Sequence, residues 1–297
     1  MPDEVISQRL STGVPGLDDL LGGGLIPGTL TVVAGAAGSG KTQLGIQFAE
    51  AGGRQEGRRG ILFDMTSRGD SQSHAEYASR MFDWRLSPVN AALAPELEGF
   101  FNGHRSPGDY LHVFEQSGRR VTRRDLETEA WRLWQAELNR KLAASIAFFY
   151  GNFTRGVRRA VIDGVEPADR PSESIQLDLF EYIYHQILRK DPEWVARDLF
   201  RQDYRRHAAE VAAHTYDPRS AACILLYTSH ETMLDRLIER PLDEGDVLAN
   251  ANTVIYLGKT RRDDRVGRSL YIAKHRGSYA TEEILPYTID AHGLRVS

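Results

Sequence analysis

Along this chain, short and fully apolar runs alternate with longer stretches in which apolar residues recur every three or four positions. The short runs are typical of buried parallel strands, and the longer stretches are typical of amphipathic helices. Strands are expected at Thr29–Ala34, Gly60–Asp64, Arg159–Asp163 and Ala221–Tyr227. Helices are expected at Gln43–Glu50, Ser71–Phe82, Arg123–Phe149, Ser172–Leu188 and Pro192–Ala213. Because strand and helix alternate, the pattern predicts an α/β fold with a twisted, mostly parallel sheet flanked by helices.

The remaining segments complete this outline. Further strands are expected near the end of the chain, at Thr253–Leu257, Ser269–Ala273 and Leu285–Asp290. The pair Gly52-Gly53 is predicted to end the first helix, and Leu86–Asp109 is rich in turn-forming residues and is predicted to be irregular. Since no linker divides the 297 residues, we expect a single domain over residues 1–297, with helical insertions at about 70–150 and 170–215.

A glycine-rich loop follows the first predicted strand and opens the first predicted helix. It reads Gly35-Ala36-Ala37-Gly38-Ser39-Gly40-Lys41-Thr42 and fits the pattern G-x-x-x-x-G-K-[ST]. The glycines let backbone N–H groups turn towards phosphate oxygens, and the helix adds the positive end of its dipole. In this pattern Lys41 reaches the β- and γ-phosphates and the Thr42 hydroxyl ligates magnesium. The loop therefore predicts binding of ATP with Mg²⁺.

A second feature is the aspartate at the end of the Arg159–Asp163 run. Parallel strands place such a carboxylate at the same edge of the sheet as the phosphate loop. Asp163 is therefore a candidate to hold magnesium, directly or through water, as a Walker-B aspartate does. The alternative is an aspartate that only caps a turn.

Several segments together resemble the RecA/RadA/KaiC-type P-loop ATPases, with the pattern closest to KaiC-like domain proteins. The segments that carry the resemblance are Leu10–Gly28 before the first strand, Leu248–Ile255, Ile272–Ser278 with its K-x-R-G pattern, and Tyr287–Val296. The middle of the chain, at roughly 66–157 and 166–220, matches only in outline.

The resemblance implies a RecA-like core that assembles into a homo-oligomeric ring or filament, which in this family can be a hexamer. It also implies that ATP lies at subunit interfaces, where Lys274 and Arg276 would reach the γ-phosphate held by the neighbouring subunit. The alternative for these two residues is a pair of solvated charges on a surface hairpin. Thr228-Ser229-His230, after the Ala221–Tyr227 run, is either a γ-phosphate sensor or a plain polar loop.

The chain departs from this family at one catalytic position. Relatives that hydrolyse ATP carry a glutamate at the end of the strand after the phosphate-loop helix, where this chain has Thr66 and Ser67. Neither side chain can act as a carboxylate base, and a positioned base contributes typically ~10²–10⁴-fold in rate. Asp64 and Glu166 are the candidate replacements, of which Asp64 is the nearer. We therefore expect slow ATP hydrolysis.

The charge balance limits the partners. The net charge of −4 argues against broad attraction to nucleic acid or to anionic membranes. The loops that would follow the third and fourth strands are not basic, and the best alternative nucleic-acid site is Arg119–Arg124. The single cysteine, Cys223, lies in an apolar run and reads as a buried thiol. No signal peptide or membrane span is recognised, so a cytoplasmic location is expected.

These observations lead to one main function hypothesis and two alternatives. The main hypothesis is an ATP-binding, nucleotide-dependent assembly or signalling switch that acts on a protein partner. One alternative is a DNA recombination or repair accessory ATPase. The other is a monomeric nucleotide-binding scaffold without turnover.

Overall fold

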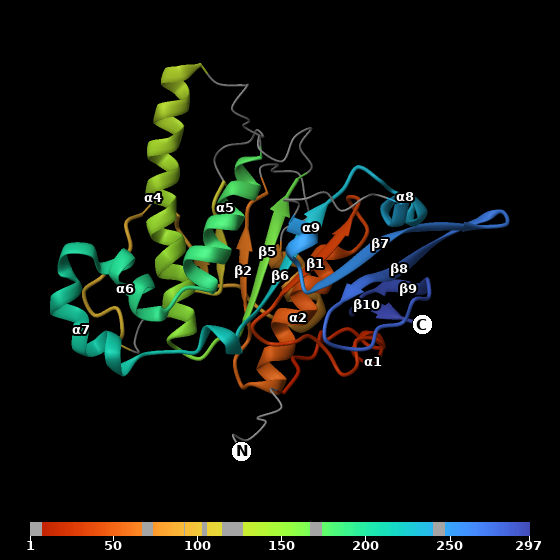
Figure 1. Cartoon of the computed structure of the whole chain (residues 1–297), viewed down its shortest axis with the longest axis horizontal. Helices are drawn as coiled ribbons and strands as arrows, with labels where there is room; N and C mark the ends of the chain where they lie inside the picture. Colours follow the sequence, from red (N-terminus) through yellow and green to blue (C-terminus); the bar gives the residue numbers. More distant parts are fainter. Residues whose placement is uncertain are drawn as a thin grey trace.

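The computed structural model describes residues 8–66, 74–91, 93–102, 106–114, 127–166, 174–239 and 247–297. Their ten strands form one sheet in the order β10-β9-β8-β7-β1-β6-β5-β2-β4-β3 (Figure 1). The strands are β1 (Leu30–Gly35), β2 (Ile61–Asp64), β3 (Pro88–Val89), β4 (Tyr110–His112), β5 (Arg159–Val165), β6 (Ala222–Thr228), β7 (Thr253–Arg262), β8 (Arg265–His275), β9 (Leu285–Asp290) and β10 (Gly293–Val296).

The sheet has a parallel part and an antiparallel part. From β7 to β3 all neighbouring strands are parallel, and from β7 to β10 they are antiparallel. The central strand β1 is buried at every position, as expected for a strand covered on both faces. The predicted α/β fold with a mostly parallel sheet is thereby confirmed.

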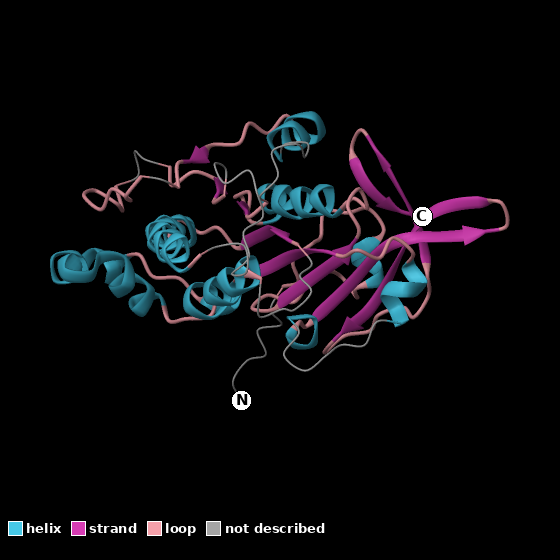
Figure 2. Ribbon diagram, turned by 90° about the horizontal axis from the view of Figure 1, so that it is seen from above, coloured by secondary structure: helices cyan, strands magenta, loops and turns pink. Residues whose placement is uncertain are grey.

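Helices cover both faces of the sheet (Figure 2). They are α1 (Leu17–Leu20), α2 (Lys41–Gln55), α3 (His74–Phe82), α4 (Thr128–Phe153), α5 (Ile175–Ile183), α6 (Pro192–Phe200), α7 (Tyr204–Ala213), α8 (Leu234–Glu239) and α9 (Val247–Asn250). One buried cluster joins the sheet to α2, α3 and the segment before β1. The other cluster joins the opposite face to α4, α5, α6 and α8.

Two predicted helix boundaries are wrong for identifiable reasons. Helix α2 continues through Gly52 to Gln55. A Cβ atom on Gly52 would lie 2.5 Å from the carbonyl oxygen of Arg58 and 2.9 Å from Cδ of Arg159, so this glycine allows close packing and does not end the helix. The single helix expected at Pro192–Ala213 is two helices, because the backbone breaks at Arg201, whose φ is 48°.

The last strands are longer than their apolar runs. Thr253–Leu257 was expected, whereas β7 extends to Arg262, and Ser269–Ala273 is the centre of a β8 that begins at Arg265. Beyond Gly258 the strands face solvent, so their side chains are mostly polar, with the exception of Val266, and the apolar pattern ends early. The predicted extent of a single domain over residues 1–297 stays a prediction.

A buried arginine ties the segment before β1 to the sheet. Arg159 on β5 is 0% exposed and lies 4.8 Å from the ring centre of Phe48. Its guanidinium donates to both carboxylate oxygens of Glu56, at 2.8 and 2.7 Å, and to the carbonyl oxygens of Ser11 and Phe48, at 2.6 and 2.8 Å. A buried guanidinium needs such partners, because leaving it unpaired is strongly destabilising.

We therefore predict that Glu56→Ala lowers the free energy of unfolding by about 3–5 kcal/mol, because it strands a buried cation. Urea titration followed by circular dichroism would measure this. The matched control is Glu239→Ala, since the ion pair of Glu239 with Arg236 is largely exposed and such pairs contribute about 0–1 kcal/mol. Equal losses in both variants would contradict the prediction.

Candidate functional site

The phosphate loop connects the carboxyl end of β1 to the start of α2. Gly38 and Gly40 have φ values of 75° and 99°, which side-chain-bearing residues rarely adopt. At Gly35 a Cβ atom would lie 2.3 Å from the carbonyl oxygen of Leu257. The hydroxyl of Tyr287 donates to the carbonyl oxygen of Ser39 at 2.6 Å and ties β9 to the loop. The loop shape therefore requires its glycines.

Two polar groups of the loop fit a phosphate ligand. The buried Lys41 Nζ donates to the carbonyl oxygens of Gly35 and Ala36, each at 2.9 Å, so it lies folded against its own loop. Burial lowers the pKa of Lys41 to about 8, although the nearby Asp163 carboxylate acts in the opposite direction. The buried hydroxyl of Ser39 has no hydrogen-bond partner within the described residues. An anion in the loop would supply acceptors for both groups.

The expected magnesium ligands lie together. Thr42, in the first turn of α2, donates its hydroxyl to Oδ2 of Asp163 at 2.8 Å. Oδ1 of Asp163 accepts the N–H of Gly164 at 2.7 Å. A hydroxyl and a carboxylate next to the phosphate loop are oxygen ligands of the kind that Mg²⁺ prefers. The fold therefore brings Thr42 and Asp163 into one place, although they are 121 residues apart.

Asp64 and Asp163 lie on neighbouring strands in the same register, Asp64 as the last residue of β2 and Asp163 two residues before the end of β5, which is longer than the predicted Arg159–Asp163. Asp64 of β2 pairs with Asp163 of β5, and both are buried. His74, the first residue of α3, lies between them, with Nδ1 3.2 Å from Oδ2 of Asp64 and Nε2 3.0 Å from Oδ2 of Asp163. The imidazole thus bridges two carboxylates that would otherwise repel each other.

The charge of His74 follows from these contacts. Burial acts to lower its pKa, but the hydrogen bonds and charges of Asp163 and Asp64 outweigh burial and raise the pKa to about 10. His74 is therefore an imidazolium near neutral pH. For Asp64, burial acts to raise the pKa, and the charge and hydrogen bond of His74 lower it well below its usual value.

Asp64 is fully engaged. Its Oδ2 accepts the hydroxyl of Tyr110 at 2.7 Å in addition to His74, and its Oδ1 accepts the N–H of Thr66 at 2.8 Å. His112 bonds the carbonyl oxygen of Thr66 at 2.8 Å. A carboxylate with these donors has little capacity left to accept a proton from water. These contacts favour a structural role for Asp64, and its catalytic role stays a prediction.

Sequence reasoning missed His74, Tyr110 and His112. None of the three belongs to a motif, and each reaches the site through tertiary structure, from α3 or from β4. The only available signal was indirect, because two strand-end aspartates side by side require a neighbouring cation.

The predicted sensor segment and the predicted pair of cations lie at opposite ends of the parallel strands, one at the carboxyl ends and the other at the amino ends. Thr228 pairs with Gly35, and the N–H of Ser229 donates to the carbonyl oxygen of Gly35 at 3.0 Å, so this strand end adjoins the phosphate loop. In contrast, Lys274 pairs with Val254 at the amino end of β7. Along β7, Val254 lies three residues before Leu257, which pairs with Gly35 of the phosphate loop, so Lys274 is about 10 Å from the level of the loop and Arg276 lies further away.

Some predicted positions lie outside the described residues: Ser67, the basic segment 119–124, and most of the loop after β5. Glu166, the second candidate base, is described, and its N–H donates to Oε1 of Gln176 at 3.2 Å. Its catalytic role stays a prediction as well.

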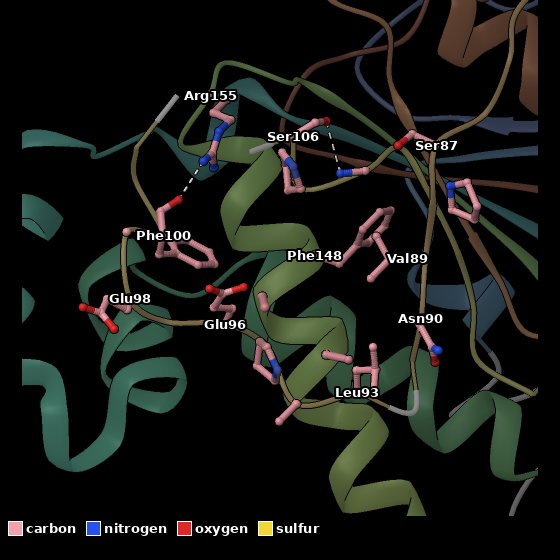
Figure 3. Close-up of a pocket in the computed structure, with 18 residues that line it drawn as sticks. Ser87, Val89, Asn90, Leu93, Glu96, Glu98, Phe100, Ser106, Phe148 and Arg155 are labelled. Carbon is pink, nitrogen blue, oxygen red and sulfur yellow. Dashed lines mark hydrogen bonds between the residues drawn. The ribbon is translucent and has the colours of Figure 1, made fainter. Parts of the chain in front are cut away.

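A cavity of about 720 Å³ lies away from the phosphate loop (Figure 3). Its floor is α4, with Ala144, Ala147 and Phe148, and Val89 faces Phe148 from the opposite wall. Arg155 closes one end and donates to the carbonyl oxygen of Phe100 at 2.7 Å. None of the lining residues belongs to the phosphate loop, so this cavity is distinct from the candidate nucleotide site.

The loop between β1 and α2, the Thr42–Asp163 contact and the strand order are features of the P-loop fold. Residues 10–94 match the family model for the KaiC ATPase. The chain is 40% identical over 78 residues to the circadian clock oscillator protein KaiC of Rippkaea orientalis, a match that covers 26% of this chain and 14% of that protein. It is 52% identical over 46 residues to the DNA repair and recombination protein RadB of Thermococcus kodakarensis. This match covers 16% of this chain and 21% of that protein.

One solved structure matches over nearly the whole length. It is the KaiC-like protein PH0186 from Pyrococcus horikoshii, with a TM-score of 0.52 at 16% identity, covering 98% of this chain and 99% of that one. This similarity concerns the fold. Together with the sequence matches it supports the RecA/KaiC-type superfamily of P-loop ATPases for this chain, as the motifs predicted. Among the described residues, no helix is long and apolar enough to cross a membrane.

The bridging histidine predicts a pH dependence of stability. Because the pKa of His74 is about 10 in the folded protein and 6.5 in the unfolded chain, its contribution is fully present below about pH 6.5 and is lost as the pH rises towards 10. In metal-free buffer, the excess stability of the wild type over His74→Gln should shrink between about pH 7 and 10.

Urea unfolding at a series of pH values would measure this difference. The exposed His230 offers the matched control, His230→Gln, for which no such trend is expected. A difference between wild type and His74→Gln that stays constant over this range would contradict the bridging role.

Proposed function

We propose that this protein binds ATP with Mg²⁺ at the phosphate loop and works as a nucleotide-dependent switch with slow hydrolysis. The observation that carries the proposal is the contact between Thr42 and Asp163. It lies beside a loop in which the buried hydroxyl of Ser39 has no hydrogen-bond partner among the described residues. Thr42 and Asp163 would hold Mg²⁺, which neutralises phosphate charge when bound. The similarity to KaiC supports the nucleotide class, and the activity of the longer relatives is here only a proposal.

Slow hydrolysis follows from two features of the β2 end. Thr66 stands where hydrolysing relatives have a glutamate, and Asp64 is held by His74, Tyr110 and the N–H of Thr66. Neither side chain is free to take a proton from water. The loss of a positioned base lowers the rate by typically ~10²–10⁴-fold while leaving ATP binding intact.

Assembly follows from the positions of Lys274 and Arg276. Lys274 and Arg276 lie close together at one edge of the sheet. The pKa of Lys274 is lowered by burial and by the neighbouring charge of Arg276. They are remote from the phosphate loop of their own subunit. We infer that they act on nucleotide held by a neighbouring subunit in a homo-oligomer. In such an assembly, the edge that carries Lys274 and Arg276 in each subunit would face the phosphate loop of the next subunit.

The first prediction from this proposal concerns turnover. Purified wild type should hydrolyse ATP slowly in the presence of magnesium, and Thr66→Glu should raise the rate, because it supplies a carboxylate just beyond the end of β2, two residues after Asp64. Thr66→Gln is the matched control, with the same size and no base, and Lys41→Ala should abolish turnover. Brisk turnover by the wild type would show that another carboxylate, with Glu166 the next to test, activates the water.

The second prediction concerns action between subunits. Arg276→Ala and Lys41→Ala should each lose turnover on their own. Mixing the two variants should restore part of it, because an intact phosphate loop then meets an intact arginine from its neighbour. Mass measurements with and without ATP should show assembly. If the mixture stays inactive and the mass is that of a monomer with ATP, the monomeric scaffold is the correct alternative.

A second candidate function is a DNA recombination or repair accessory ATPase. The similarity to RadB over 46 residues favours it. The match covers 16% of this chain and 21% of that protein, so by itself it does not extend the function of RadB to this chain. Salt-sensitive DNA binding that is lost on changing Arg119–Arg124 would support this function.

A further inference from the structure

The hairpin of β7 and β8 projects from the body of the protein (Figures 1 and 2). At its base, a Cβ atom on Gly258 would touch Leu234 of α8, and the N–H of Lys259 donates to the carbonyl oxygen of Thr232 at 2.9 Å. From residue 260 the hairpin leaves these supports. We call residues 259–268 the cationic arm, because five of its ten residues are basic and two are acidic, in a chain whose net charge is −4.

One face of the arm carries most of this charge. Lys259 pairs with Arg268, and Arg261 pairs with Val266. Side chains alternate along a strand and paired residues share a face, so these four lie on the same side of the ribbon. It is the side on which Leu257 and Leu270 pack towards α2, the helix that opens at the phosphate loop. All four side chains are exposed.

The grouping of like charges on this face does not stabilise the fold of the subunit. Lys259 and Arg268 face each other across the strands, and like charges in directly opposite positions destabilise a sheet. Val266, on the same face and nearer the tip, is 61% exposed. Within the described residues, no ion pair joins Lys259, Arg265 or Arg268 to a carboxylate. An anionic ligand outside the subunit would relieve the repulsion.

We propose that the cationic arm binds the phosphate backbone of a nucleic acid. A two-stranded β-ribbon is one of the two elements that fit the ~12 Å major groove of DNA. Protein–protein hot spots are enriched in tryptophan, tyrosine and arginine, and this face has arginines but no aromatic residue, with Val266 as its one apolar side chain. Nucleic-acid binding takes most of its non-specific affinity from lysine and arginine on phosphate, which is the chemistry that the arm presents.

The cationic arm shares no residues with the candidate ATP site. It begins beyond Leu257, which is level with Gly35, so it extends past the edge of the sheet that carries the phosphate loop. No residue of the phosphate loop is needed for its contacts. The proposal therefore stands or falls separately from ATP binding.

The test is fluorescence anisotropy of a labelled 20-base-pair duplex with the full chain, in roughly 50–200 mM salt. Wild type should bind, with log K falling linearly as log salt concentration rises. Lys259→Gln/Arg268→Gln should weaken binding and make this slope shallower by about 2, since each phosphate contact contributes about 0.9. Asp263→Asn/Asp264→Asn should tighten binding by removing the acidic tip, and asparagine tolerates the φ of 51° at position 263.

Two control variants show whether the charged face of the arm carries the binding. Gly267→Gln lies on the opposite face, its Cβ meets no atom within 4 Å, and it should leave binding unchanged. Lys41→Ala removes the phosphate-loop lysine and should also leave it unchanged. The proposal is overturned if wild type does not bind, if the slope is unaltered in the double glutamine variant, if Lys41→Ala abolishes binding, or if polyglutamate competes as well as DNA.

Discussion

Two carboxylates lie side by side on adjacent parallel strands, and the site depends on how their repulsion is resolved. Asp64 and Asp163 are in register and buried, so both can stay ionised only if a cation lies between them. The cation is the imidazolium of His74. To place it, α3 must begin at the carboxyl edge of the sheet, and β4 must follow β2 so that Tyr110 can close the remaining side of Asp64. Much of the edge beside β2 is thus arranged around one ion cluster.

The sequence predicted those parts of the fold that depend on local pattern. The phosphate loop, the buried strand before it and Asp163 after the apolar run of β5 carry their signal in consecutive residues, because backbone conformation and burial there are local requirements. Gly52 shows the limit of this reasoning. It resembles a helix end, yet it is a packing position against Arg159, a residue 107 positions away that no local pattern connects to it. His74 is a stronger case, because a histidine at the start of a helix has no signature until two strand ends are known to be adjacent.

The parallel strands give the molecule two edges with different chemistry. The carboxyl edge carries the phosphate loop, Thr42 and the ion cluster, and the cationic arm extends past it. The amino edge carries Lys274 and Arg276. Arg159 and the segment before β1 hold α2 against the sheet, and α2 in turn positions the loop. A subunit built in this way can offer cations from one edge to a ligand held at the other edge of its neighbour.

The balance of charges at the candidate site gives a physical reason to expect that binding of nucleotide favours association of subunits. Lys41 and His74 are balanced by Asp64 and Asp163, so the cluster is close to neutral before any ligand binds. ATP with one Mg²⁺ brings about two further negative charges, and in a poorly hydrated site these need cationic partners. The loop N–H groups and the helix dipole supply part of this compensation. In the proposed homo-oligomer, Lys274 and Arg276 of a neighbour would supply the rest. Association would then be more favourable for a subunit with bound nucleotide than for an empty one. The proposed coupling requires no hydrolysis, so it is compatible with threonine at position 66.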